Sequence, residues 1–235
     1  MAANHTLNPQ TSVSNWKPLY RLGALGALSM VGIILIQLVF FIAAPPPFEG
    51  TATDWFAFFE KDQLAGLIGF ELLLVVSVVL SIPLILALYV ALGPVDRSLS
   101  ALYLVLSLVG VLCFIAARPA VEMLSLSHGY AAAGTEAERA MFAAAGEALI
   151  AVFNGSAFYV SYVLGSITGL IISVVMLRSK IFSKATAYVR IASSVFDFGL
   201  FIPVVGMYIS IFSVLFLFTW NLMVARRLFQ LAREA

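Results

Sequence analysis

The chain has 235 residues, of which 62% are hydrophobic and 11% charged, and its mean hydropathy is +1.04. Soluble domains are typically about 45–50% apolar and about 25% charged, so the composition excludes an ordinary soluble protein and indicates the membrane class. A net charge of +1 without a dense basic run argues against nucleic-acid binding, and a single cysteine, Cys113, excludes an internal disulfide.

The N-terminal part predicts a polar tail followed by a first transmembrane helix. Residues 1–18 are polar and aperiodic, which predicts a disordered cytoplasmic tail. Residues 19–232 are expected to form one transmembrane domain. The apolar run 20–43 is too long for a signal peptide, whose apolar region has about 7–15 residues, so we expect it to remain as a helix. Three prolines at 45–47 end that helix.

The next segment, 51–62, predicts a short interfacial helix in the first outer loop. A threonine is available to cap it, and its acidic residues would face water. We expect its aromatic side chains to lie at the bilayer surface. These side chains are Trp55, Phe56, Phe58 and Phe59.

Two further transmembrane helices are predicted in the middle of the chain. Residues 64–92 form a helix longer than the roughly 30 Å hydrocarbon core, with a bend at Pro83. Residues 99–117 form the next helix, and Arg118-Pro119 marks its outer end or a kink. The weakly polar stretch 120–134 is expected to be a loop. Thr135 then caps an amphipathic helix that precedes the fourth transmembrane helix.

The fourth predicted transmembrane helix, 155–177, carries small residues at every fourth position. This spacing lets helix backbones approach closely in lipid. The small-residue stripe therefore predicts packing inside the bundle, with a homo-oligomer or an interface with other membrane proteins as the alternative. Its members are Ser161, Gly165, Gly169 and Ser173.

The C-terminal part predicts a helical hairpin and the orientation of the chain. A basic loop precedes helix 5, which runs from 185 or 188 to 203, and helix 6 covers 207–229. With both termini inside, ten of the thirteen lysines and arginines lie on the cytoplasmic side. Because basic loops resist translocation, the chain is predicted to be multi-pass with the N- and C-termini in the cytoplasm.

Five polar residues near the predicted outer surface are candidates for a ligand site. Ionisable groups inside a bilayer are costly and point to function. We expect these residues to converge on an outward-facing polar cavity that binds a small or lipid-like ligand. They are Glu71, Arg118, Glu122, Glu147 and Asn154.

Two other interpretations of this group remain open. Arg118 could pair with Glu71, or with Glu122 one helical turn away, and simply lock helices together. Alternatively, Glu122, His128 and Glu147 could form an intramembrane enzyme site acting on lipid, if they lie within hydrogen-bond reach.

Asp197 is a second intramembrane acid, near the middle of the fifth predicted helix. A structural hydrogen bond to another helix, with Gln37 as a candidate partner, and a proton or cation relay are both open. The sequence contains no motif that predicts a metal or cofactor site. It has neither a mid-membrane lysine for retinal nor two facing histidines for haem.

Three features together resemble a known family. They are the stretch 84–99, LILALYVALGPVDRSL, the stretch 176–183, MLRSKIFS, and the order of six helices with a long acidic segment before the fourth. These resemble the prokaryotic membrane proteins grouped as domain of unknown function 4386. The resemblance implies a six-helix all-α integral membrane fold in a prokaryotic cytoplasmic membrane, and it carries over no catalytic residue. Ligand binding, for sensing or transport, is the favoured function, and a structural or accessory membrane subunit is the alternative.

Overall fold

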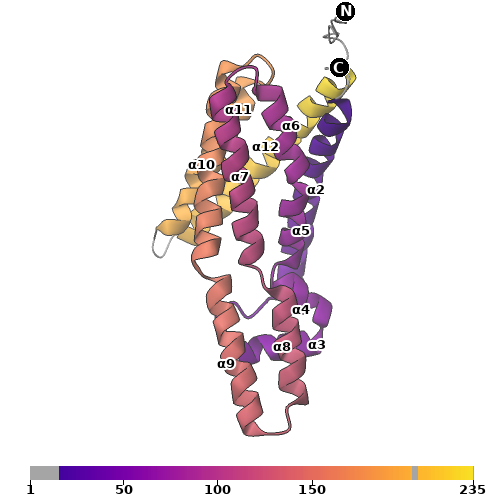
Figure 1. Cartoon of the computed structure of the whole chain (residues 1–235), viewed down its shortest axis with the longest axis vertical. Helices are drawn as coiled ribbons and strands as arrows, with labels where there is room; N and C mark the ends of the chain where they lie inside the picture. Colours follow the sequence, from indigo (N-terminus) through magenta and orange to yellow (C-terminus); the bar gives the residue numbers. More distant parts are fainter. Residues whose placement is uncertain (1–15, 203–205, 235) are drawn as a thin grey trace, which may run out of the picture. The chain divides into compact units, whose positions relative to one another are not determined.

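The computed structural model describes residues 16–202 and 206–234, and these contain helices but no strand (Figure 1). The predicted all-α fold is therefore confirmed. The helices of the first half are α2 (Lys17–Ala43), α3 (Ala52–Lys61), α4 (Gln63–Gly69), α5 (Leu72–Leu80), α6 (Ile82–Leu92) and α7 (Arg97–Ala116). The second half contains α8 (Ala120–Ala132), α9 (Glu136–Phe153), α10 (Ser156–Arg178), α11 (Lys184–Asp197), the 3-10 helix η1 (Phe198–Phe201) and α12 (Gly206–Glu234). The predicted tail lies almost wholly outside the described residues, as does Pro203.

Five helical stretches of the described residues are long and apolar enough to cross a membrane: Lys17–Ala43, Leu72–Leu92, Arg97–Ala132, Glu136–Arg178 and Phe212–Glu234. The chain is thus a multi-pass membrane protein by length and composition. The fifth predicted span is the exception. Its helix, α11, has 14 residues, and the chain continues as η1 rather than as one long helix.

The chain divides into two compact units. Unit 1 comprises the described residues of Met1–Ser29, Leu80–Val105 and Thr168–Ala235. In it, α11 and α12 pack along each other, with the C-terminal part of α10 beside them (Figure 1). The N-terminal part of α2 approaches α6 closely, because a Cβ atom on Gly23 would lie 2.7 Å from Ala87 Cβ.

Unit 2, Met30–Val79 and Leu106–Ile167, has its own aromatic core. The α8–α9 pair forms a hairpin, and α3 lies across both helices (Figure 1). Thr51 and Thr135 cap α3 and α9 through complete capping boxes. α9 can approach α3 closely because Gly146 has no side chain, and a Cβ there would lie 2.7 Å from Ala52 Cβ.

The prediction that the aromatic side chains of α3 lie at the bilayer surface is wrong for three of them. Trp55, Phe56 and Phe59 are buried in the protein, against Phe70 and residues of α8 and α9, rather than lying at the bilayer surface. An amphipathic helix presents an apolar face, and the local sequence does not state whether lipid or protein covers it. Here the hairpin supplies the covering surface.

The prediction of one long helix over 64–92 is also corrected, because the structure has three helices there, α4, α5 and α6. The Ser81 break precedes Pro83, as expected for a proline at the start of a helix. The other break is at Glu71, which adopts a positive φ of 63°. That conformation costs a residue with a Cβ about 1–2 kcal/mol, so tertiary contacts must hold it. The stretch 120–134 is likewise mainly helix rather than loop, which places His128 on α8.

Candidate functional site

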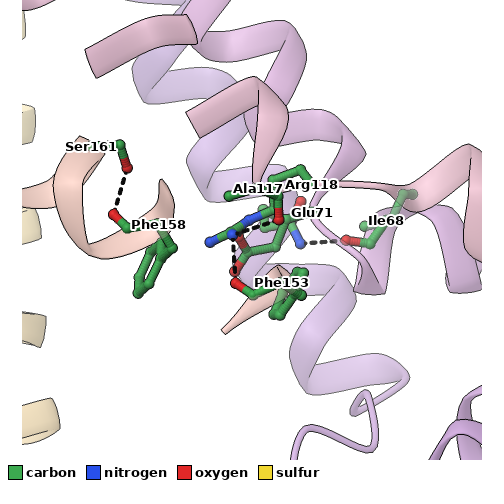
Figure 2. A network of polar contacts seen from close by, with 8 residues as sticks. Ile68, Glu71, Ala117, Arg118, Phe153, Phe158 and Ser161 are labelled. Carbon is green, nitrogen blue, oxygen red and sulfur yellow. Dashed lines mark hydrogen bonds and ion pairs between the residues drawn. The ribbon is translucent and has the colours of Figure 1, made fainter. Parts of the chain in front are cut away.

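Three interruptions of the helices in unit 2 meet around one side chain, that of Arg118 (Figure 2). The chain breaks between α4 and α5 at Glu71, between α7 and α8 before Pro119, and between α9 and α10 at Asn154-Gly155. Proline lacks the donor that a helix interior needs, and Asn-Gly favours a helix end, so two of these breaks follow from the local sequence.

The Arg118 guanidinium is buried and binds polar groups through its Nε and Nη1 atoms. Its Nε donates to Glu71 Oε2 at 2.5 Å, and only 2% of the Arg118 side chain is exposed. Its Nη1 donates to the carbonyls of Ala117 and Phe153 at 3.1 Å each, as Figure 2 shows. Both carbonyls lie where a helix ends and the next intrahelical donor is missing. One arginine therefore satisfies the ends of α7 and α9 and neutralises Glu71.

Three aromatic rings surround the same guanidinium. Its Cζ lies 4.6 Å from the ring centroid of Phe114, 4.3 Å from that of Phe153 and 4.6 Å from that of Phe158. Cation–π contacts at these distances stabilise a desolvated cation. The arrangement locks helices α5, α7, α9 and α10 at one point, which is the structural pairing considered above, with Glu71 rather than Glu122 as the partner.

Gln37 of α2, one candidate considered as a partner of Asp197, extends this polar network. Its Nε2 donates to the carbonyl of Ile68 at 2.7 Å, near the end of α4. Its Oε1 is buried and has no hydrogen-bond partner among the described residues. The carbonyl of Ile68 is accessible to a side chain because α4 ends at the next residue, Gly69.

The other three predicted ligand-site residues do not join Arg118. Glu122 is exposed on α8, beside an open groove that is otherwise lined by Val121, Ser125 and Leu126 of α8 and by Ala145 and Leu149 of α9. Glu147 accepts a hydrogen bond from the backbone N–H of Ala52 at 2.7 Å and so anchors the start of α3 to α9. Asn154 is exposed at the end of α9.

Glu122, His128 and Glu147, the residues of the hypothetical lipid-enzyme site, do not contact one another among the described residues. His128 Nε2 is 3.0 Å from Gln63 Nε2 and does not contact Glu122 or Glu147 within the described part of the chain. Across residues 16–202 and 206–234, no three histidine, cysteine or acidic side chains are placed to hold a metal ion.

Asp197 belongs to a separate polar cluster in unit 1. Its Oδ2 lies 4.0 Å from Arg190 Nη1, and the Ser213 hydroxyl of α12 also bonds to it. Arg190 stacks near Trp220, with Cζ 5.3 Å from the ring centroid, and donates to Ser193 Oγ at 3.1 Å. The seven-residue spacing places Arg190 and Asp197 on one face of a helix, whereas no local pattern indicates the contact with Trp220.

The small-residue stripe of α10 has two different environments. A Cβ on Gly169 would lie 2.7 Å from Arg190 Cζ, whereas a Cβ on Gly165 would meet nothing within 4 Å. Ser161 and Ser173 are buried, and their hydroxyls bond to carbonyls of their own helix, those of Phe158 and Gly169.

The sequence comparison identifies the family. The family described as Domain of unknown function (DUF4386) matches residues 24–230. The chain belongs to this family. No curated protein and no solved structure matches it. The DUF4386 assignment agrees with the resemblance seen in the stretches 84–99 and 176–183. The family description assigns no activity, so a function has to be inferred from the geometry of the residues.

Proposed function

We propose that this DUF4386 protein crosses a prokaryotic cytoplasmic membrane six times, with both termini inside. The distribution of polar and apolar side chains around α11 supports a sixth crossing. Its buried face is polar and includes Thr186, Ser193 and Ser194, whereas Tyr188 and Val195 are 59% and 57% exposed. In water this distribution would be reversed, so the exposed apolar face fits lipid.

Charge supports the proposed orientation. Unit 1 contains ten of the thirteen lysines and arginines and three acids, whereas unit 2 contains three basic residues and nine of the twelve acids. The loop 93–98, which contains Arg97, and the basic loop 178–184 then lie in the cytoplasm, and the acidic segments 44–71 and 118–155 lie outside.

The proposed function is the binding of a cationic amphiphile on the outer side, for sensing or transport. The observation that carries this proposal is Glu122. Its carboxylate is exposed, has no partner among the described residues, and stands at the edge of the largely apolar α8–α9 groove. Nine acids against three basic residues in unit 2 favour a positively charged head group. Glu71, Arg118 and Glu147 then support the site structurally, since each already has a protein partner.

Titration of octyltrimethylammonium into the protein in nanodiscs tests this proposal. Glu122→Gln should weaken binding about two- to fivefold, the value of a partly exposed ion pair. Glu136→Gln, which removes an exposed acid outside the groove, is the matched control and should leave affinity unchanged. Equal affinity in the wild type and in Glu122→Gln would refute the assignment.

A second candidate function is an accessory membrane subunit that packs through α10. The open space at Gly165 favours it, because a partner helix could approach there. Native mass spectrometry of Gly165→Leu tests this, with Gly32→Leu as the control, since Gly32 has equally open space on α2. Loss of a complex only in Gly165→Leu would support this candidate, and an unchanged monomer in both would count against it.

A further inference from the structure

The α8–α9 groove of unit 2 has two polar side chains among its lining residues, those of Glu122 and Ser125. The other lining residues are apolar: Val121, Leu126, Ala145 and Leu149. Both polar side chains come from α8 and both are exposed. Residues three apart on a helix are neighbours, with Cβ atoms about 5–6 Å apart, so one ligand atom can contact both side chains.

These two side chains are available to a ligand. The α8–α9 hairpin has four acids. Of these, Glu136 forms an ion pair, Glu138 caps α9 and Glu147 anchors α3. Neither Glu122 nor Ser125 makes a hydrogen bond or an ion pair with another residue in the described part of the chain. The groove therefore offers a carboxylate and a hydroxyl, and both can accept hydrogen bonds.

The chemistry of the lining residues favours a cation that donates hydrogen bonds. A primary ammonium has three N–H donors, which match the acceptor oxygens of a carboxylate and a hydroxyl. Hydrogen bonds between ionised groups are also shorter and stronger than those between neutral groups. A quaternary ammonium has no N–H, and proteins recognise it through the faces of aromatic rings. None of the six residues that line the groove is aromatic.

The exposure of the groove favours the same head group. An ammonium is strongly hydrated, so its complete enclosure would cost much of its hydration free energy. Because Glu122 and Ser125 are exposed, a head group bound to them keeps part of its water. An alkyl chain attached to that head group can lie along the half-buried Leu126 and Leu149, in the way that a lysine side chain covers apolar surface with its charge in water.

We propose that the α8–α9 groove selects amphiphiles with a primary ammonium head group, whose N–H groups donate to the Glu122 carboxylate and to the Ser125 hydroxyl. The alkyl chain lies against Leu126 and Leu149. This inference rests on the proposed function, the binding of a cationic amphiphile. It adds the chemical class of the head group, and it assigns to Ser125 the distinction between an ammonium that donates hydrogen bonds and one that cannot.

Titration of two cations that differ only in methylation of the nitrogen tests the head group. Octylammonium and octyltrimethylammonium are both cationic at pH 7, since the pKa of an alkylamine is near that of lysine, about 10. Isothermal titration calorimetry uses the protein in nanodiscs, with protein-free nanodiscs to subtract partition into lipid. The wild-type Kd for octylammonium should be about three- to tenfold lower than that for octyltrimethylammonium, as expected for a hydrogen bond made by only one of the two cations.

Variants of Ser125 test its role in this preference. Ser125→Ala should move the ratio of the two Kd values toward one, and Ser125→Thr, which keeps a hydroxyl, should retain the preference. Ser98→Ala is the matched control, because it removes an exposed hydroxyl of α7 outside the groove, and it should keep the wild-type ratio. A ratio in Ser125→Ala equal to that in Ser98→Ala would overturn the proposal.

The Glu122→Gln variant separates failure of this inference from failure of the proposed function. Equal wild-type Kd values for the two cations, both raised by Glu122→Gln, would overturn the preference for a primary ammonium and support the binding of cationic amphiphiles in general. Equal Kd values that Glu122→Gln leaves unchanged would overturn both.

Discussion

Two buried arginines show how single residues determine local structure in this protein. Arg118 has its charge matched by Glu71, its Nη1 donates to two carbonyls, and aromatic rings lie against its guanidinium. Arg190 has a more distant carboxylate, donates to Ser193 and lies near the Trp220 ring. A buried ion pair contributes little net stability over apolar replacements, but removal of one partner leaves an uncompensated charge.

The Arg118–Glu71 pair gives a prediction at this scale. Glu71→Gln should lower the free energy of unfolding by about 3–5 kcal/mol, because Arg118 stays charged and buried. The double variant Glu71→Met with Arg118→Met should be more stable than Glu71→Gln, since no charge is left buried. Denaturant unfolding in mild detergent measures both. Arg139→Gln, which breaks an exposed pair with Glu136, should change stability by less than about 0.5 kcal/mol. A double variant as unstable as Glu71→Gln would contradict this reasoning.

At the scale of elements, α10 contains two glycines with opposite roles. Gly169→Ala should destabilise the protein by about 1–3 kcal/mol, because its Cβ would overlap Arg190 and Ser194. Gly165→Ala should be neutral or stabilising by up to about 1 kcal/mol, since alanine favours the helix and the space is open. Thermal unfolding of the two variants side by side is the measurement, and equal losses would show that helix propensity rather than packing decides.

The N-terminus of α3 gives a pH prediction. Hydrogen bonds from the backbone N–H and the hydroxyl of Thr51 lower the pKa of Asp54. A carboxyl whose pKa is lower in the folded state stabilises the fold above its unfolded pKa, and this contribution is lost as the pH falls through the folded value. The protection of the α3 amides from hydrogen exchange, relative to the intrinsic rate at each pH, should therefore fall below about pH 4.

Two variants test this assignment. Asp54→Asn should remove the acid-dependent change in α3 exchange. Glu60→Gln, an exposed acid on the same helix that does not bond to the N-cap, should preserve it. A wild-type profile that survives in Asp54→Asn would assign the change to another group.

At the scale of the whole molecule, the separation of charge along the chain predicts its topology. A reporter inserted at 178–184 and a reporter fused after Ala235 should both lie in the cytoplasm if α11 and η1 complete a crossing. With five crossings the two reporters would lie on opposite sides. A reporter inserted at 133–135 should be external. Alkaline phosphatase activity in intact cells measures each site, and an external reporter after Ala235 would overturn the six-span topology.

Much of the helical organisation could be predicted from local sequence. The apolar runs, the threonine caps at Thr51 and Thr135, and the breaks at Pro119 and Asn154-Gly155 depend on neighbouring residues, and the structure has all of them. The pairing of Arg118 with a nearby acid was also foreseeable as one of several alternatives. Each of these features arises from interactions within one or two helical turns. Such interactions involve residues close in sequence, so the local sequence is enough to predict them.

Composition and residue order by themselves determined the membrane class, the helix content and the family of this protein. Only the tertiary structure decided that Glu71 adopts a positive φ, that Gln37 bonds to Ile68, and that the α3 rings face protein. These outcomes depend on contacts between segments far apart in sequence. Apolar side chains alone do not specify which helices pack together, because in lipid the free energy of contact with another helix differs little from that of contact with lipid tails.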